Sequence, residues 1–198
     1  MTEPGGITKL LRRISDGDKA AEGEFFECVY AELKRQAAYF LRGERPNHTL
    51  QPSALVNEAY ISLAKRQKLE FSDRNHFFAV SAQVMRHLLV DSARRHRSKK
   101  RDHGMQVELD EGMVSAPDCS AMLELDQALV RLATEEPRAA QVAEMKHFGG
   151  MTNVDIAAYL KVNPKTIVRD WALARAMLRV ELKGVEGGER AKAQNNCP

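Results

Sequence analysis

Apolar residues recur at intervals of three and four along most of this chain, and this spacing constrains the fold more than any other feature of the sequence. Such spacing places apolar side chains on one face of an α-helix. Strict alternation of apolar and polar residues, which is typical of half-buried β-strands, is almost absent. The sequence therefore predicts an all-α protein.

Three long helices are predicted in the first half of the chain. The first runs from about residue 18 to about residue 42. The second begins near Pro52 or Ser53, since proline is tolerated in the first turn of a helix. The third begins after Ser72 or Asp73, either of which is a good N-cap, and it continues into a basic segment.

The helical pattern fails between Gly104 and Ser120, where glycine, proline and acidic residues predict a flexible, negatively charged connector. We expect this connector to separate two small helical domains. Helical spacing then resumes, and the polar, glycine-containing end of the chain predicts disorder. The expected division is a first domain at 7–103, a linker at 104–120, a second domain at 121–183 and a disordered tail at 184–198.

Charge, cysteine content and hydropathy indicate which partners and which cellular location to expect. The 30 Lys+Arg against 27 Asp+Glu give a net charge of +3, which is too small to indicate a polyanionic partner. The three cysteines lie far apart, so neither a disulfide framework nor a zinc site is expected. The sequence has no signal-peptide pattern and no apolar run long enough to cross a membrane. We therefore expect a soluble, cytoplasmic protein with no membrane partner.

No catalytic or cofactor site is expected. The six histidines do not show the spacing of metal ligands, and no cysteine pair accompanies them. Glu58 has no apparent second carboxylate, nucleophile or glycine-rich phosphate loop beside it. The sequence thus predicts a protein that is not an enzyme and needs no metal, cofactor or small-molecule substrate.

The most informative stretch runs from Thr152 to Leu178. Thr152 and Asp155 resemble a capping box that opens a short helix. Asn163 is a strong N-cap and Pro164 a favoured first helical residue, so a second helix begins there after a tight turn. Two such helices joined by a short turn predict a helix-turn-helix.

The second helix of this motif fits the DNA major groove, where its N-terminal residues meet base edges and phosphates. The candidate DNA-binding residues at this end are Asn163, Lys165, Thr166, Arg169 and Asp170. The alternative is an αα-hairpin inside a helical bundle, in which these side chains are merely solvated.

A second informative stretch, Arg86 to Arg101, holds seven cations against the single acid Asp91. Aromatic residues lie nearby at Phe71, Phe77 and Phe78. Basic grooves with aromatic stacking platforms hold single-stranded nucleic acid. A solvated helix end is the alternative for the cations, and a core position is the alternative for Phe77 or Phe78.

Three segments together resemble the extracytoplasmic-function sigma factors, within them a subfamily with a longer first domain from planctomycete-like and acidobacterial genomes. Residues 50–63 are similar to the helix that docks on the polymerase clamp. Residues 76–95 are similar to the promoter-melting helix, and residues 148–171 to the DNA-reading motif of the second domain. The resemblance covers about residues 7–182.

The resemblance implies a role for each domain. The first domain would bind core RNA polymerase, at the clamp of the beta-prime subunit, through Leu55, Asn57, Glu58 and Tyr60. It would also capture the unpaired minus-10 strand, for which the candidate residues are Phe77, Arg86, Arg94, Arg95 and Arg97. The second domain would read the minus-35 duplex, and the acidic linker would thread the polymerase interior. An anti-sigma regulator stays open as a further partner.

Two departures from better-known members concern the polymerase contacts. Their clamp-binding helix carries Gln-Glu where this chain has Asn57 and Glu58, and the loop at 43–51 is longer here than in most. These departures concern which residues of this chain contact core RNA polymerase. They do not change the assignment of the two domains.

Two other functions compete with this interpretation. A free-standing helix-turn-helix regulator would use the second domain in the same way and the first for dimerisation, but a dimer interface is depleted of charge at its centre, unlike the segment at 86–101. A recombinase or nuclease would need a nucleophile with an arginine set, or clustered metal-binding carboxylates, and the sequence offers neither.

Overall fold

The structure, a computed structural model, describes residues 6–40, 52–65, 71–102 and 119–194. Within these ranges it contains helices and no strand, which confirms the predicted all-α fold. In chain order the helices are α1 (Gly6–Ser15), α2 (Lys19–Phe40), α3 (Pro52–Lys65), α4 (Arg74–Asp102), α5 (Cys119–Glu135), α6 (Pro137–His147), α7 (Asn153–Leu160) and α8 (Pro164–Gln194).

Several helices begin where the local chemistry predicts. Helix α3 starts at Pro52, and α4 starts directly after Asp73. The backbone N–H of His76 donates to the Asp73 carboxylate at 2.9 Å, so Asp73 is the N-cap of α4. Helix α6 starts at Pro137. Proline has no backbone N–H, and it suits this position because the N–H groups in the first turn of a helix have no partner within the helix.

Helix α1 is an element that the sequence analysis did not predict. Ile7, Leu10 and Leu11 are buried at helical spacing, and α1 packs on α2 and α4. After α1 the chain turns through Gly17, whose φ of +88° lies in the left-handed region. The Asp18 carboxylate then accepts hydrogen bonds from the backbone N–H groups of Ala20 and Ala21 and caps α2.

The far end of the chain also differs from the expectation. Helix α8 continues through Gln194, whereas disorder was predicted from residue 184 onward. Each glycine costs a helix only about 1 kcal/mol, and the intervening Glu, Arg, Lys and Ala residues are good helix formers. Residues 195–198 lie outside the described ranges. So does most of the predicted acidic linker, since residues 103–118 are not described and α5 begins at Cys119.

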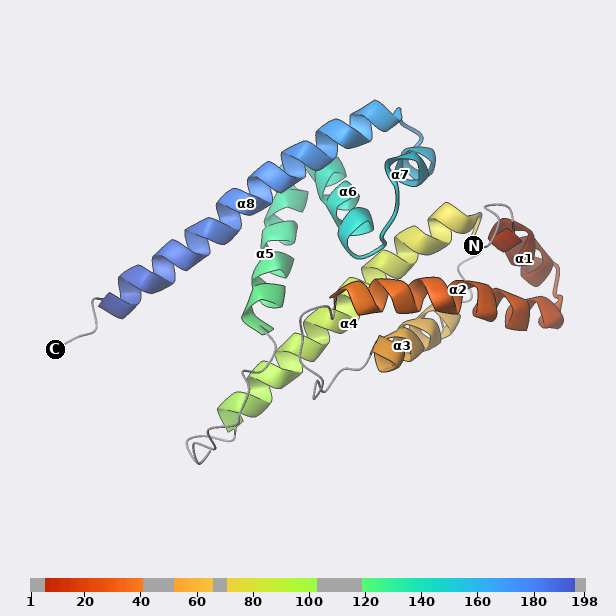
Figure 1. Cartoon of the computed structure of the whole chain (residues 1–198), viewed down its shortest axis with the longest axis horizontal. Helices are drawn as coiled ribbons and strands as arrows, with labels where there is room; N and C mark the ends of the chain where they lie inside the picture. Colours follow the sequence, from red (N-terminus) through yellow and green to blue (C-terminus); the bar gives the residue numbers. More distant parts are fainter. Residues whose placement is uncertain (1–5, 41–51, 66–70, 103–118, 195–198) are drawn as a thin grey trace.

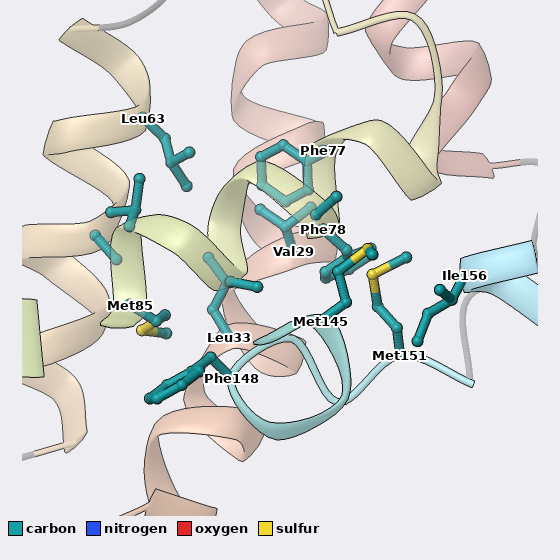
Figure 2. Close-up of a cluster of buried hydrophobic side chains, with 14 of the residues drawn as sticks. Val29, Leu33, Leu63, Phe77, Phe78, Met85, Met145, Phe148, Met151 and Ile156 are labelled. Atoms are coloured by element: carbon teal, nitrogen blue, oxygen red, sulfur yellow. The ribbon is translucent and has the colours of Figure 1, made fainter. Parts of the chain in front are cut away.

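Helix α4 lies between the two halves of the molecule (Figure 1). On one side it packs against α3 and α1, and on the other against α5, α6 and α7. A single cluster of buried side chains runs through both halves: Val29, Leu33, Phe77 and Met85 from the first meet Met145, Phe148, Met151 and Ile156 from the second (Figure 2). The two predicted domains therefore share a core in this structure, a relation that the sequence left open.

Candidate nucleic-acid interface

The turn between α7 and α8 has the geometry of a helix-turn-helix. The Thr152 hydroxyl accepts the backbone N–H of Asp155 at 3.2 Å, and the Asp155 carboxylate accepts the Thr152 N–H at 3.2 Å, which completes the predicted capping box. Lys161 ends α7 with a left-handed φ of 54°. The Asn163 side chain then accepts the backbone N–H of Lys165 at 2.9 Å, so Asn163 caps α8 as predicted.

Three of the candidate residues on α8 are available to a ligand. Lys165 and Arg169 are exposed and Thr166 is half-buried, all within the first two turns of α8. The opposite face of the helix is fixed in the core by the fully buried Ile167 and Ala174. The leading end of α8 therefore presents cations and a hydroxyl on a rigid support, as a recognition helix requires.

Asp170 does not belong to this exposed face, which corrects the prediction for that residue. Its side chain is buried, 8% of the residue being exposed, and it accepts two hydrogen bonds from the Arg138 guanidinium, at 2.6 and 3.1 Å. These bonds raise the pKa of Arg138 above its ordinary value. Asp170 lies three residues after the buried Ile167, at the inward edge of the helix, so it ties α8 to α6 rather than facing DNA.

The aromatic side chains at the start of α4 form core packing. Phe77 is 1% exposed and meets Phe25, Phe71 and Phe78 edge to face, with ring centroids 5.0 to 5.3 Å apart. The prediction of Phe77 as a base-stacking residue is therefore wrong in this structure, and the core alternative holds. Phe71 is the member of the three that stays partly exposed.

The cations of α4 fall into two groups. Arg94, Arg95 and Arg97 are exposed on the C-terminal half of the helix, where a strong positive field can bind phosphates. Arg86 is only 15% exposed and is paired with Asp126 at 2.8 Å and Glu144 at 3.2 Å. The predicted DNA contact at Arg86 is thus blocked in this conformation. Lys99, Lys100 and Arg101 lie in α4, but their side chains are outside the described part.

The candidate polymerase-binding residues on α3 also divide. Leu55 is completely buried in the core and cannot reach a partner, so its predicted contact is corrected to a structural one. Asn57 and Glu58 are exposed. Tyr60 is half-buried, with its ring 4.4 Å from that of Phe26, and this burial, helped by the charge of Glu22, raises its pKa.

Ile61 is a surface residue that the sequence analysis did not single out. It is 51% exposed and follows Asn57 by four residues, so both lie on one face of α3. Phe26 of α2 lies beside this face through its contact with Tyr60. Its four-residue spacing from Asn57 is the signal by which the sequence could have identified Ile61.

No group of three or more His, Cys, Asp and Glu side chains in the described ranges could hold a metal ion. The helices in those ranges include none that is long and apolar enough to span a membrane. Among the candidate residues, exposed cations lie on two separate helices, at the leading end of α8 and on the C-terminal half of α4.

Comparison with known families finds a match over most of the chain. The family model described as "ECF sigma factor" matches residues 4–184, which is nearly the whole chain. The chain belongs to the ECF sigma factor family. As an ECF sigma factor it binds core RNA polymerase and promoter DNA, and it functions in promoter recognition and transcription initiation. The match does not favour a free-standing regulator. No curated protein matches the chain.

Proposed function

We propose that this ECF sigma factor divides promoter recognition between its two halves: the leading end of α8 reads the minus-35 duplex, and the cations of α4 hold the melted minus-10 strand. The observation that carries the proposal is the helix-turn-helix, whose second helix exposes Lys165 and Arg169 at its leading end. Phosphate contacts supply affinity that falls with salt, and a few base contacts supply sequence choice.

The minus-10 contacts are assigned to Arg94, Arg95 and Arg97. These side chains are exposed, whereas Phe77 is in the core. Phe71, which is partly exposed and packs edge to face on Phe77, takes over the proposed stacking position. A base extruded from the melted strand would lie beside α4, with its unstacking cost of a few kcal/mol offset by stacking and polymerase contacts.

The polymerase contact is assigned to the exposed face of α3, with Asn57, Glu58 and Tyr60 retained from the sequence and Ile61 added. An exposed aliphatic side chain beside polar ones suits a protein interface, whose centre is depleted of charge. The partner is the clamp of the beta-prime subunit. We also propose that the chain belongs to the subfamily with an extended first domain and that it acts in the cytoplasm. We further propose that an anti-sigma protein binds it, and that an acidic linker joins its two domains.

The experiment that tests the division of labour replaces Arg169 with alanine. Loss of one base-edge or phosphate contact should weaken binding to minus-35 duplex DNA by about 1–3 kcal/mol, roughly 5- to 150-fold. Arg179→Ala is the matched control, because Arg179 is exposed on the same helix but lies well beyond its leading end. Both variants should bind core polymerase like the wild type; loss of polymerase binding in Arg169→Ala alone would refute the division.

A further inference from the structure

An exposed valine lies among the cations at the leading end of α8. Val168 is 52% exposed, although valine is among the residue types that are most often buried. It shares one helical face with Lys165, Arg169 and Ala172, because these three and Val168 fall at helical spacing, and all four are exposed. Of the four, Val168 has the largest apolar side chain. The face that the proposed function turns toward the minus-35 duplex therefore contains an apolar group between its cations.

Folding does not account for a valine at this position. Single exposed apolar residues are common on protein surfaces. Valine, however, is a weaker helix former than lysine, arginine or alanine. It also gains no core packing in return, because Val168 does not belong to the hydrophobic core cluster that includes Ile167 and Ala174. A ligand that covers this face would give the side chain a role that folding does not.

The direction in which Val168 points is fixed by contacts on the other side of α8. Ile167 is fully buried. Asp170 accepts two hydrogen bonds from an arginine of α6, at 2.6 and 3.1 Å. The Trp171 ring lies beneath the Lys146 ammonium, whose nitrogen is 5.9 Å from the ring centroid. These contacts hold α8 in one rotational setting, so Val168 stays on the outward face.

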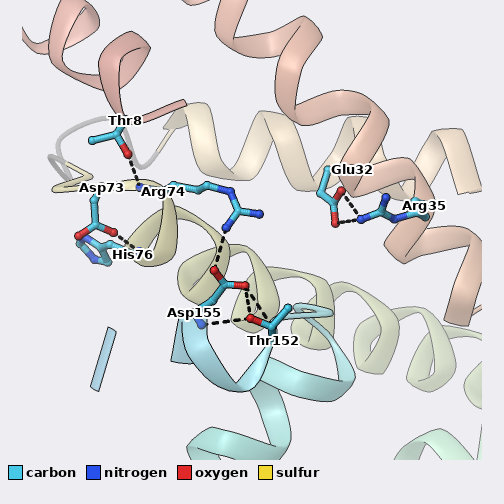
Figure 3. Close-up of polar contacts among 8 residues, drawn as sticks. All are labelled: Thr8, Glu32, Arg35, Asp73, Arg74, His76, Thr152 and Asp155. Atoms are coloured by element: carbon cyan, nitrogen blue, oxygen red, sulfur yellow. Dashed lines mark hydrogen bonds and ion pairs between the residues drawn. The ribbon is translucent and has the colours of Figure 1, made fainter. Parts of the chain in front are cut away.

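Helix α7 gives α8 a fixed support. Figure 3 shows Thr152 and Asp155 together at the start of α7, where the Thr152 hydroxyl also donates to the Asp155 carboxylate at 2.7 Å. At the other end of α7 the N–H of Val162 donates to the carbonyl of Ala157 at 3.0 Å, within the turn that leads to α8. Helices α7 and α8 pack against each other. The leading end of α8 is therefore preorganised for a ligand, which lowers the entropic cost of binding.

The chemistry of the major groove narrows what Val168 can contact. Every base pair presents hydrogen-bond donors and acceptors there, and among the four bases thymine adds a methyl group. Valine can neither donate nor accept a hydrogen bond with its side chain. Against a guanine, adenine or cytosine edge it would displace water from polar atoms and leave them without a partner. Against the thymine methyl it buries apolar surface, so thymine is the base that matches this side chain.

Two further features of the face suit such a contact. In a helix a valine side chain keeps one rotamer almost exclusively, so Val168 loses little conformational freedom on binding. Ala172, exposed one turn further along α8, has a side chain too short to hold the helix away from the bases. Lys165 and Arg169 have long side chains that can bind phosphates or guanine edges on the same face.

We infer that Val168 is a specificity-determining residue for minus-35 recognition: its methyl groups contact the C5 methyl group of one thymine in the major groove. The inference rests on the proposed function of α8 as the helix that reads the duplex. Lys165 and Arg169 supply the part of the affinity that depends on salt. Val168 adds a preference for thymine at one position without adding charge.

The test removes the thymine methyl and the valine methyls separately and together. A promoter at which the chain directs initiation supplies the minus-35 duplex, and each thymine in it is replaced in turn by uracil, which lacks only the methyl group. Fluorescence anisotropy measures binding of the labelled duplexes to the complex of the full chain with core polymerase. For the wild type, uracil at one position should weaken binding about fourfold, equal to about 0.8 kcal/mol, as expected for one buried methyl group.

Val168→Ser should remove this difference, so that thymine and uracil duplexes bind equally at that position. Val180→Ser is the matched control, because Val180 is 73% exposed on the same helix and lies well beyond its leading end. The control should keep the fourfold difference. An undiminished difference in Val168→Ser, or a wild type that distinguishes uracil from thymine at no position, would overturn the inference.

The salt dependence of binding gives an independent readout. Val168→Ser removes no charge, so the slope of the logarithm of affinity against the logarithm of salt concentration should equal that of the wild type. A shallower slope would mean that the substitution disturbs phosphate contacts rather than a methyl contact, which would contradict the inference.

Arg169→Ala, measured on the same duplexes, separates failure of the inference from failure of the proposed function. If α8 reads the duplex but Val168 does not contact a thymine, Arg169→Ala weakens binding while Val168→Ser keeps the wild-type difference between thymine and uracil. If the proposed function itself fails, Arg169→Ala binds the minus-35 duplex as tightly as the wild type.

Discussion

A charged or aromatic side chain can serve a ligand only if its helix turns it outward, and neighbouring residues of this chain differ sharply in that respect. Phe77 and Leu55 lie in the core, while Asn57 and Arg169 are exposed. Asp170 differs from Arg169 by one position, yet it is buried against Arg138. Whether a residue belongs to a candidate site therefore depends on the exposure of its own side chain, even when its neighbours in the sequence are exposed.

The core position of Phe77 predicts a large cost for its removal. Phe77→Ala should lower the free energy of unfolding by about 3–5 kcal/mol, because it deletes a buried ring and leaves a cavity. Val130→Ala is the control, at a position 56% exposed, and should change stability by no more than about 0.5 kcal/mol. Urea denaturation followed by circular dichroism measures both. If Phe77→Ala left the free energy of unfolding nearly unchanged, Phe77 would not be a core residue.

Helices begin and end in this chain where short-range chemistry marks them. Asp73, Thr152 and Asn163 each supply a side-chain cap. Thr152 and Asn163 were identified from the sequence, and Asp73 was one of two candidates, with Ser72. Caps act within one turn, so they can be recognised without knowledge of the fold. This explains why the starts of both helices of the helix-turn-helix were predicted.

The capping box of α7 predicts a moderate, specific loss on mutation. Thr152→Ala removes the acceptor for the Asp155 N–H and should cost about 0.5–2 kcal/mol of stability. Thr152→Ser keeps the hydroxyl and should stay close to the wild type. Thermal unfolding compares the two variants, and an equal shift in both would show that the hydroxyl is not what matters at this position.

The C-terminal half of α4 carries a prediction about DNA melting. Replacing Arg94 and Arg95 with alanine removes two exposed cations and should impair open-complex formation more than polymerase association. Lys9→Ala with Arg12→Ala removes two exposed cations from α1 as a control. Permanganate footprinting reports unpaired thymines in the promoter, and an unchanged footprint in the α4 variant would count against the assignment.

The packing of helices that lie far apart in the sequence could not be predicted in the same way. The sequence predicted the all-α class and most helix boundaries, because those depend on periodicity and caps. It missed α1, although Ile7, Leu10 and Leu11 carry the helical spacing, and it ended α8 too early. Among the candidate site residues, the sequence placed Lys165 and Arg169 on an exposed face, but it could not show that Phe77 and Leu55 are in the core. Nor could it show that Arg86 meets Asp126 from a distant helix.

At the scale of the whole molecule, the leading end of α8 and the cations on the C-terminal half of α4 are exposed, whereas Arg86 of α4 is paired with carboxylates of α5 and α6. These two states of accessibility follow from one feature, the position of α4 between the two halves. Since phosphate contacts dominate the affinity of such sites, both should weaken as salt rises. Through these contacts the chain confers promoter choice on a core RNA polymerase that lacks it.

In vitro transcription with core RNA polymerase from the source organism, with and without this protein, over a pool of that organism's promoters, tests this claim most directly. We predict that defined start sites appear only when the chain is added, and that Arg169→Ala reduces them while Arg179→Ala does not. Transcripts no different from those of core polymerase alone would contradict the account.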